Sequence, residues 1–442
     1  MQDKRLKPGG CSPIISHQRK EKIMFDQITL PNGLRVVGEK LGHIHSCTVG
    51  VWVKVGSVNE LPEENGLSHF IEHMVFKGTK NRTARQIAEE MDMVGGQLNA
   101  FTSKECTCFY AKVIDEDLRL AVDILSDLAL RPTFDEKELN KERGVVLEEI
   151  AMVDDTPEDM VHELLAEAQF DGSLSMPILG PRQRIAAYSR GDLLNYWRRH
   201  YVPRNMVVSI AGNYDWEAFL ALINRYFDAF PNPNAEETPD HPQHFHSGRL
   251  AHEKDSEQLH ICMGFEGAPT GSDELYDISV FSNVLGGGMS SRMFQRIREE
   301  LGMAYTIYTY PGAYNGIGCL NLYVGTNPEN GETVIREIQE QLRKWKTEPM
   351  SEKEFLSAKA QLRSGYVMGL ESSSGRMQSL GRRLLLQGDL RSPEEVLAKI
   401  EAVTPERVMA VAEKVLGSVP AAAVVGQNAK TYLQWMGESK LG

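Results

Sequence analysis

The sequence has few cysteines, no long hydrophobic run and no excess of basic residues. Six cysteines in 442 residues do not make a disulfide framework, and we interpret them as reduced, buried thiols. No stretch approaches the roughly 18 consecutive apolar residues that span a bilayer, so we expect no membrane insertion. The 61 acidic residues outnumber the 48 basic ones and give a formal net charge of −13, which argues against a protein that binds nucleic acid.

The first 23 residues are basic, but they lack the apolar core of a secretory signal. Asp3 and Glu21 also fit poorly with a mitochondrial presequence, which is poor in acidic residues. A clear strand pattern begins only at Met24. We therefore interpret residues 1–23 as a flexible N-terminal extension and expect the protein in the cytoplasm.

Hydrophobic periodicity divides the rest of the chain into two similar halves. Residues 24–230 alternate strand and helix patterns, and residues 231–250 interrupt them with four prolines, which predicts a linker. A second series occupies residues 251–442, in which the segment at 351–354 repeats the segment at 135–138 with an offset of 216. The patterns predict an α+β fold: two homologous α/β repeats of about 200 residues, each a mixed, mostly antiparallel sheet with helices packed on it.

The strongest chemical signal is the segment His69-Phe70-Ile71-Glu72-His73, which lies in a helical pattern. Residues four apart share one face of a helix, so the imidazoles of His69 and His73 can bind one tetrahedral zinc ion. Glu72 stands beside them, where its carboxylate can take a proton from a water molecule on the zinc. This is the inverted zinc-protease motif.

A catalytic zinc site needs a third protein ligand. The helical pattern that begins at Asp135 offers Glu142 and Glu149, which are seven residues apart and share a face, whereas Glu148 points about 100° away. Spacing alone allows Glu149 as the ligand with Glu142 as its supporting partner, or the reverse. Shifted by 216 residues, the two positions become Ala358 and Gly365. We therefore expect the C-terminal repeat to lack zinc ligands and to build the other wall of the site.

The order of the motifs resembles the insulinase/pitrilysin family of zinc peptidases, above all its short members, which include mitochondrial processing peptidase and its bacterial relatives. The resemblance runs from about Met24 to the C-terminus and rests on three segments: His69-x-x-Glu72-His73, Gly95-Gly96-x-x-Asn99-Ala100-Phe101-Thr102 and Glu142-Arg143-x-Val145-Val146-x-Glu148-Glu149-Ile150. It implies that Glu149 is the third zinc ligand and that Glu142 orients the site.

The resemblance also implies residues that contact the substrate. An edge strand at about Leu98–Thr102, with Asn99, Ala100 and Phe101, would pair with the backbone of a peptide substrate. In the C-terminal repeat, Tyr305 would donate a hydrogen bond to the developing oxyanion and Arg298 would anchor the substrate backbone.

These features together predict a zinc-dependent endopeptidase that hydrolyses peptides or unfolded segments inside a chamber formed by paired subunits, with one Zn²⁺ per chain and Glu72 as the base. Because one chain carries both the zinc motif and the Arg298–Tyr305 pair, we expect a homodimer, with a heterodimer as the alternative. The competing functions are a dedicated processing protease and a scaffold subunit, either of which would need a partner chain.

Overall fold

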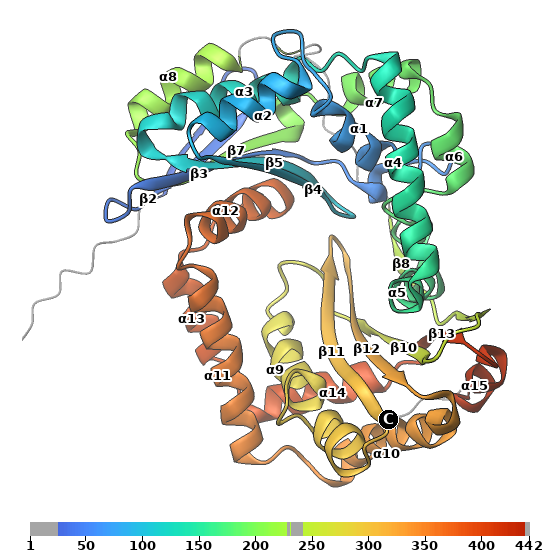
Figure 1. Cartoon of the computed structure of the whole chain (residues 1–442). Helices are drawn as coiled ribbons and strands as arrows, with labels where there is room; N and C mark the ends of the chain where they lie inside the picture. Colours follow the sequence, from blue (N-terminus) through green and yellow to red (C-terminus); the bar gives the residue numbers. More distant parts are fainter. Residues whose placement is uncertain (1–24, 228–229, 231–241, 438–442) are drawn as a thin grey trace, which may run out of the picture.

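The computed structural model describes residues 25–227, 230 and 242–437. The predicted N-terminal extension (1–23) and residues 231–241 of the predicted linker lie outside this part. Two lobes, each built on a sheet, are connected by long helices (Figure 1). Among the described helices, none combines the length and the apolar character needed to cross a membrane.

The N-terminal half forms a sheet with the strand order β1-β2-β7-β3-β5-β4, in which β2 and β7 run parallel and all other neighbours antiparallel. Its elements are β1 (Asp26–Thr29), β2 (Arg35–Lys40), β3 (Ser46–Val53), α1 (Leu67–Val75), α2 (Ala84–Met93), β4 (Gln97–Thr102), β5 (Thr107–Ile114), α3 (Leu118–Leu130), α4 (Glu136–Asp155), α5 (Pro157–Gln169), β6 (Phe170–Asp171), α6 (Arg182–Ala187), α7 (Arg190–His200), β7 (Met206–Gly212) and α8 (Trp216–Tyr226).

The C-terminal half forms a sheet with the order β11-β12-β10-β13-β9, in which β13 and β9 run parallel. Its elements are β8 (His244–Phe245), β9 (Arg249–Glu253), β10 (Leu259–Gly267), α9 (Glu274–Gly286), the π-helical η5 (Phe294–Glu300), β11 (Ala304–Tyr314), β12 (Ile317–Thr326), α10 (Gly331–Thr347), α11 (Glu352–Gly369), α12 (Ser373–Gln387), α13 (Pro393–Glu401), α14 (Pro405–Leu416), β13 (Ala421–Gly426) and α15 (Ala429–Trp435).

Apart from β1, which is added at one edge of the first sheet, the two sheets have the same topology. From β9, the second sheet runs β9-β13-β10-β12-β11. These strands correspond in turn to β2-β7-β3-β5-β4 of the first sheet. Each sheet has one parallel pair at the same place, and the other neighbours are antiparallel. The predicted fold class, two homologous repeats with mixed and mostly antiparallel sheets, is confirmed.

The two halves exchange equivalent helices. α5 of the N-terminal half packs on β10 and β13, and α12 of the C-terminal half packs on β3 and β7. Shifted by the 216-residue offset, Pro157 at the start of α5 falls on Ser373 at the start of α12. Beneath α12, buried Trp52 donates a hydrogen bond to Ser209 Oγ at 2.8 Å, and Gly381 lies so close to the indole that no Cβ would fit. Each half therefore completes its core with a helix from the other.

Candidate metal centre

Helix α1 presents the His69–His73 segment because its apolar residues all lie on one side. Leu67, Phe70, Ile71, Met74 and Val75 are buried in the core of the N-terminal half. With that stripe in the core, the three polar residues of the motif lie on the other side of α1, which contacts α4 and the edge strand β4.

The start of α1 is fixed by a buried carboxylate. Glu60 accepts hydrogen bonds from the backbone N–H groups of Gly66 at 2.8 Å and Ser68 at 2.7 Å, and from Asn65 Nδ2 at 2.9 Å. These bonds satisfy N–H groups that a helix start leaves without partners. Gly66 has φ +97° and lies against the backbone of Gly180, so a side chain is excluded there. The first turn of α1 is thereby held in place.

Burial raises the pKa of Glu60 from 4.5 to about 7, although its hydrogen bonds work in the opposite direction. Between these two pH values the folded state holds a proton that the unfolded state has lost. The unfolding free energy should therefore fall as the pH rises from about 4.5 to about 7, by at most about 3 kcal/mol. Urea unfolding at several pH values between 5 and 8 should show this loss in the wild type and a flatter profile in Glu60→Gln. Parallel profiles would contradict the prediction.

Helix α4 supplies the acidic residues. It starts at an N-cap, Asp135, whose side chain accepts hydrogen bonds from the N–H groups of Lys137 and Glu138. Leu139, Val146 and Ile150 anchor one face in the core, and α4 packs on α1 and α5. Glu142 is buried beside α1, whereas Glu149 is partly exposed two turns further along.

The structure brings His69, His73 and Glu149 together. Glu149 Oε2 lies 3.7 Å from His69 Nε2 and 3.5 Å from His73 Nε2, and one donor atom of each residue lies within 4.8 Å of the others. Ligands on one tetrahedral ion with bonds of about 2.0–2.1 Å are about 3.4 Å apart. Two imidazoles and a carboxylate are also a donor set found in catalytic zinc sites. The residues present therefore fit a zinc ion.

The surroundings shift the pKa values of the two imidazoles in opposite directions. Burial lowers the pKa of His69 to about 3, helped by the nearby His73, so its ring is neutral and can offer a lone pair. At His73, burial works to lower the pKa, but the hydrogen bond to Glu142 and the charge of Glu149 outweigh it and raise the pKa. His73 Nδ1 lies 2.8 Å from Glu142 Oε1. In the neutral tautomer that donates Nδ1–H to Glu142, Nε2 of His73 is free to face the metal position.

Glu142 is held in turn by Lys77. Its second oxygen lies 2.8 Å from Lys77 Nζ. Burial would raise the pKa of Glu142, but the hydrogen bonds from His73 and Lys77 outweigh burial and lower it. The carboxylate therefore stays ionised and orients His73. Lys77 was not among the predicted site residues, although a cation four residues after His73, just beyond the end of α1, was a signal.

Glu72 lies between the metal position and the edge of the sheet. Its carboxylate accepts a hydrogen bond from Thr102 Oγ1 at 2.5 Å, and Thr102 is the last residue of β4. Burial raises the pKa of Glu72, while the Thr102 bond works against that rise. A carboxylate with a raised pKa is a stronger base, which suits proton transfer near neutral pH. Thr102 belongs to a motif quoted in the sequence analysis, but its contact with Glu72 was not predicted.

The predicted substrate strand is the edge strand β4, which pairs with β5 on one side only. Asn99 is exposed, and its side chain accepts a hydrogen bond from the N–H of Ala100 at 2.8 Å. Phe101, two residues further along the same face, packs edge-on against Trp52, with 5.7 Å between ring centroids. The side chain of Phe101 thus packs beneath α12, whereas the edge of β4 beside Glu72 has no strand partner among the described residues. The roles of these three residues with substrate stay predictions.

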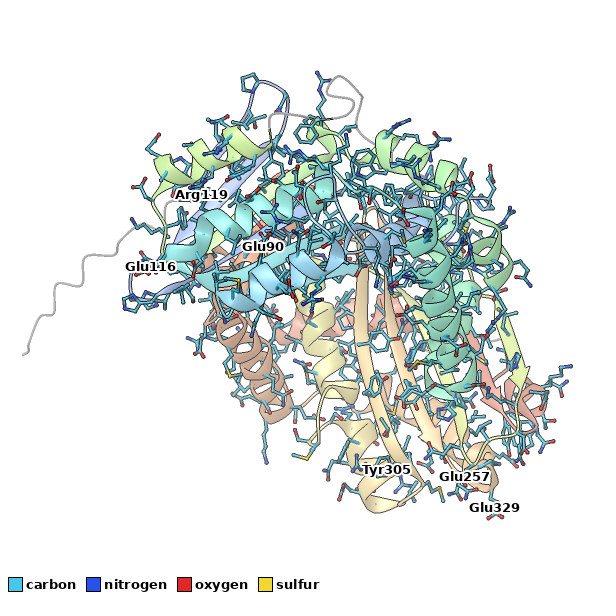
Figure 2. The ribbon with its side chains drawn as sticks, turned by 45° about the horizontal axis from the view of Figure 1, so that its top comes forward. Glu90, Glu116, Arg119, Glu257, Tyr305 and Glu329 are labelled. Atoms are coloured by element: carbon cyan, nitrogen blue, oxygen red, sulfur yellow. The ribbon has the colours of Figure 1, made fainter. Side chains whose placement is uncertain are left out.

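The structure does not bring Arg298 and Tyr305 to the metal cluster of the same chain. The Arg298 guanidinium stacks over the Phe294 and Tyr305 rings, 4.7 and 5.4 Å from their centroids, and Tyr305 is 75% exposed. The strand β11 separates Tyr305 from the tip of its hairpin, where Asn315 N–H donates to Glu105 of the N-terminal half at 2.6 Å. Its length puts Tyr305 about 30 Å from that contact. Figure 2 shows Tyr305 at the end of the molecule away from the N-terminal lobe.

Both halves of the chain match known proteins of one peptidase family. Residues 35–182 match the family model of the insulinase family, peptidase family M16, and residues 187–362 match the model of the M16 inactive domain. The uncharacterized zinc protease YmxG of Bacillus subtilis is 40% identical over 92% of this chain and 99% of its own length. An uncharacterized zinc protease of Rickettsia felis is 35% identical over 91% and 98%.

A solved structure supports the fold. The crystal structure of a protease from Helicobacter pylori superposes with a TM-score of 0.86 at 22% identity and covers 91% of this chain and 99% of that one. The two family models and the zinc-protease relatives agree on the family, and the cluster of His69, His73 and Glu149 is compatible with the zinc site of such a peptidase. The chain belongs to the insulinase family of zinc metallopeptidases, peptidase family M16.

Proposed function

We propose that the chain is a zinc endopeptidase that cuts peptides or unfolded segments, with Glu72 as the general base. The observation that carries the proposal is that Glu72 lies between the donor triangle of His69, His73 and Glu149 and the free edge of β4. This arrangement holds a base between a metal and a strand that can bind a peptide backbone.

In this proposal each group has a separate task. A bound zinc ion would acidify water and polarise the scissile carbonyl. Glu72 takes a proton from the attacking water on one oxygen while Thr102 holds the other, and then delivers the proton to the leaving amine. Glu142 keeps the proton of His73 on Nδ1. The edge of β4 holds the substrate extended, so that many sequences can be accepted.

The position of Tyr305 and Arg298 favours paired chains. Tyr305 is exposed at the end of the molecule away from the N-terminal lobe, and the guanidinium of Arg298 stacks over its ring. A second copy that faces this one would present its Tyr305 and Arg298 to the metal centre and would close a chamber around the substrate. We propose a homodimer with one Zn²⁺ per chain. The described cysteines, all buried and free (Cys47, Cys106, Cys108, Cys262 and Cys319), suit a reducing compartment such as the cytoplasm.

Metal removal tests the proposed activity. Zinc-loaded protein should hydrolyse members of a panel of internally quenched fluorescent peptides, and the products should show internal cleavage by mass spectrometry. Treatment with 1,10-phenanthroline should abolish hydrolysis, and zinc should restore it. Glu149→Gln, which replaces one proposed carboxylate ligand by an amide, should bind zinc more weakly. Glu148→Gln, at the position directly before Glu149, is the matched control. Hydrolysis that persists without metal, or a zinc-loaded protein that cuts no peptide, would contradict the proposal.

A further inference from the structure

The metal-binding helix is so short that both of its imidazoles lie in terminal turns. α1 spans nine residues, with His69 in the first turn and His73 in the last. Terminal turns open easily when their backbone groups lack partners. Glu60 holds the first turn. The position of His73 therefore depends on what fixes the chain directly after Val75.

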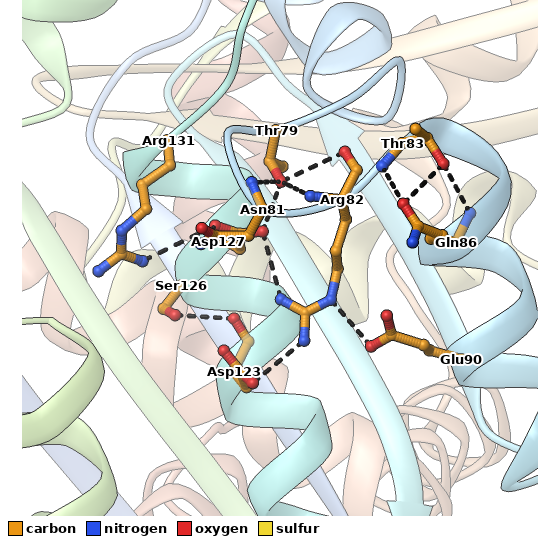
Figure 3. Close-up of polar contacts among 10 residues, drawn as sticks. All are labelled: Thr79, Asn81, Arg82, Thr83, Gln86, Glu90, Asp123, Ser126, Asp127 and Arg131. Carbon is orange, nitrogen blue, oxygen red and sulfur yellow. Dashed lines mark hydrogen bonds and ion pairs between the residues drawn. The ribbon is translucent and has the colours of Figure 1, made fainter.

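That chain segment is anchored on Asp127 of α3 (Figure 3). The Asp127 carboxylate is fully buried and accepts hydrogen bonds from Thr79 Oγ1 at 2.5 Å, Asn81 Nδ2 at 2.7 Å and Arg82 at 3.2 Å. Thr79 Oγ1 in turn accepts the backbone N–H groups of Asn81 and Arg82 at 3.2 and 2.9 Å. One hydroxyl thus closes the turn and ties it to α3.

Further bonds make the anchor rigid. The carbonyl of Gly78 accepts a hydrogen bond from the N–H of Thr133 at 3.1 Å, and the N–H of Lys80 donates to the carbonyl of Arg131 at 2.9 Å. Arg82 also reaches Glu90 of α2 at 2.9 Å and Asp123 of α3 at 3.1 Å (Figure 3). The segment between α1 and α2 is therefore bonded to α2, to α3 and to the loop after α3.

Lys77 links this anchor to the metal centre. It directly precedes Gly78, its N–H donates to the carbonyl of Met74 in the last turn of α1 at 3.1 Å, and its ammonium group lies 2.8 Å from Glu142. Glu142 holds His73. A displaced backbone at Lys77 would loosen the last turn of α1 and pull the cation away from Glu142, and both changes would release His73.

We propose that Asp127 and Thr79 are positioning residues of the metal centre, which hold His73 in place by anchoring the chain after α1. The inference rests on the proposed zinc-dependent function. A buried carboxylate carries a desolvation cost that an apolar residue would not. The side chains of Thr79, Asn81 and Arg82, which donate hydrogen bonds to Asp127, all belong to the loop after α1. We therefore infer that the buried carboxylate is there to hold this loop.

The test measures zinc binding by the full chain, not catalysis. We expect Thr79→Val, which keeps the shape but removes the hydroxyl, to weaken zinc affinity about 10–100-fold in competition with a chromophoric chelator. The visible spectrum of the Co²⁺-substituted protein should change with it, and Thr79→Ser, which restores the hydroxyl, should restore both. The matched control is Asp277→Asn, because Asp277 is a buried carboxylate paired with an arginine, Arg407, in the C-terminal half.

Each outcome decides the inference. Wild-type affinity and an unchanged cobalt spectrum in folded Thr79→Val would overturn it, as would an equal loss of affinity in Asp277→Asn. If circular dichroism shows that Thr79→Val is unfolded, Arg82→Lys replaces it, since lysine keeps the charge but loses the forked contact with Asp123 and Asp127. Wild-type protein that binds no zinc would contradict the proposed function itself, before any variant is compared.

Discussion

Replacing Glu72 with glutamine is expected to lower kcat for peptide hydrolysis by about 10²–10⁴-fold while zinc stays bound, because removal of a general base costs about that much. Glutamine keeps the size of the side chain and can still accept the hydrogen bond from Thr102, which the carboxylate accepts at 2.5 Å. It cannot take a proton from water. The measurement is steady-state hydrolysis of a quenched peptide by protein of equal zinc content.

The loss should appear in kcat and leave KM nearly unchanged, since in the proposed mechanism Glu72 acts on the attacking water and the edge of β4 binds the peptide. Glu148→Gln is the control, because it makes the same chemical change on an exposed position of α4 next to Glu149, the proposed ligand. Equal activity of Glu72→Gln and wild type would exclude Glu72 as the base. A parallel loss of bound zinc would instead assign it a role in holding the metal.

The metal cluster could be predicted from the sequence because helical spacing fixes which side chains share a face. His69 and His73 are four residues apart, and Glu142 and Glu149 are seven apart. Helical geometry alone therefore predicts that the two histidines share one helix face and that the two glutamates share another. The choice between the two glutamates required the position of α4 relative to α1, which spacing does not contain. The family resemblance made that choice, and in the structure Glu149 meets both Nε2 atoms while Glu142 meets Nδ1 of His73.

Contacts between distant segments could not be predicted in this way. Asp127 has no local signal that it would hold the loop at Thr79, 48 residues earlier. The exchange of α5 and α12 between the two sheets was equally hidden, since both helices have ordinary amphipathic patterns. The 216-residue offset identified the repeats but not which sheet each helix covers. The sequence also grouped Arg298 and Tyr305 with the site, although β11 carries Tyr305 away from the metal centre of its own chain.

Because Tyr305 lies far from the metal centre of its own chain, we expect it to act in the site of the other chain of a dimer. Dimers of two different variants can test this. Tyr305→Phe should lower kcat by about 10²–10³-fold, the cost of one lost oxyanion donor. If each site combines Glu72 of one chain with Tyr305 of the other, both single-variant homodimers are nearly inactive. A heterodimer of Glu72→Gln with Tyr305→Phe, however, keeps one site in which both residues are intact. It should show about half of the wild-type activity, because a two-fold dimer has two equivalent sites.

The heterodimer can be isolated by co-expression of two differently tagged chains and two successive affinity steps. A dimer that carries both substitutions in the same chain, paired with wild type, is the control: its two sites each lack one group, so it should be nearly inactive despite having a complete wild-type chain. If Tyr305 acted within its own chain, the two results would be reversed. The comparison therefore separates the two assignments by opposite outcomes with the same substitutions. Full activity of the Tyr305→Phe homodimer would remove Tyr305 from the chemistry altogether.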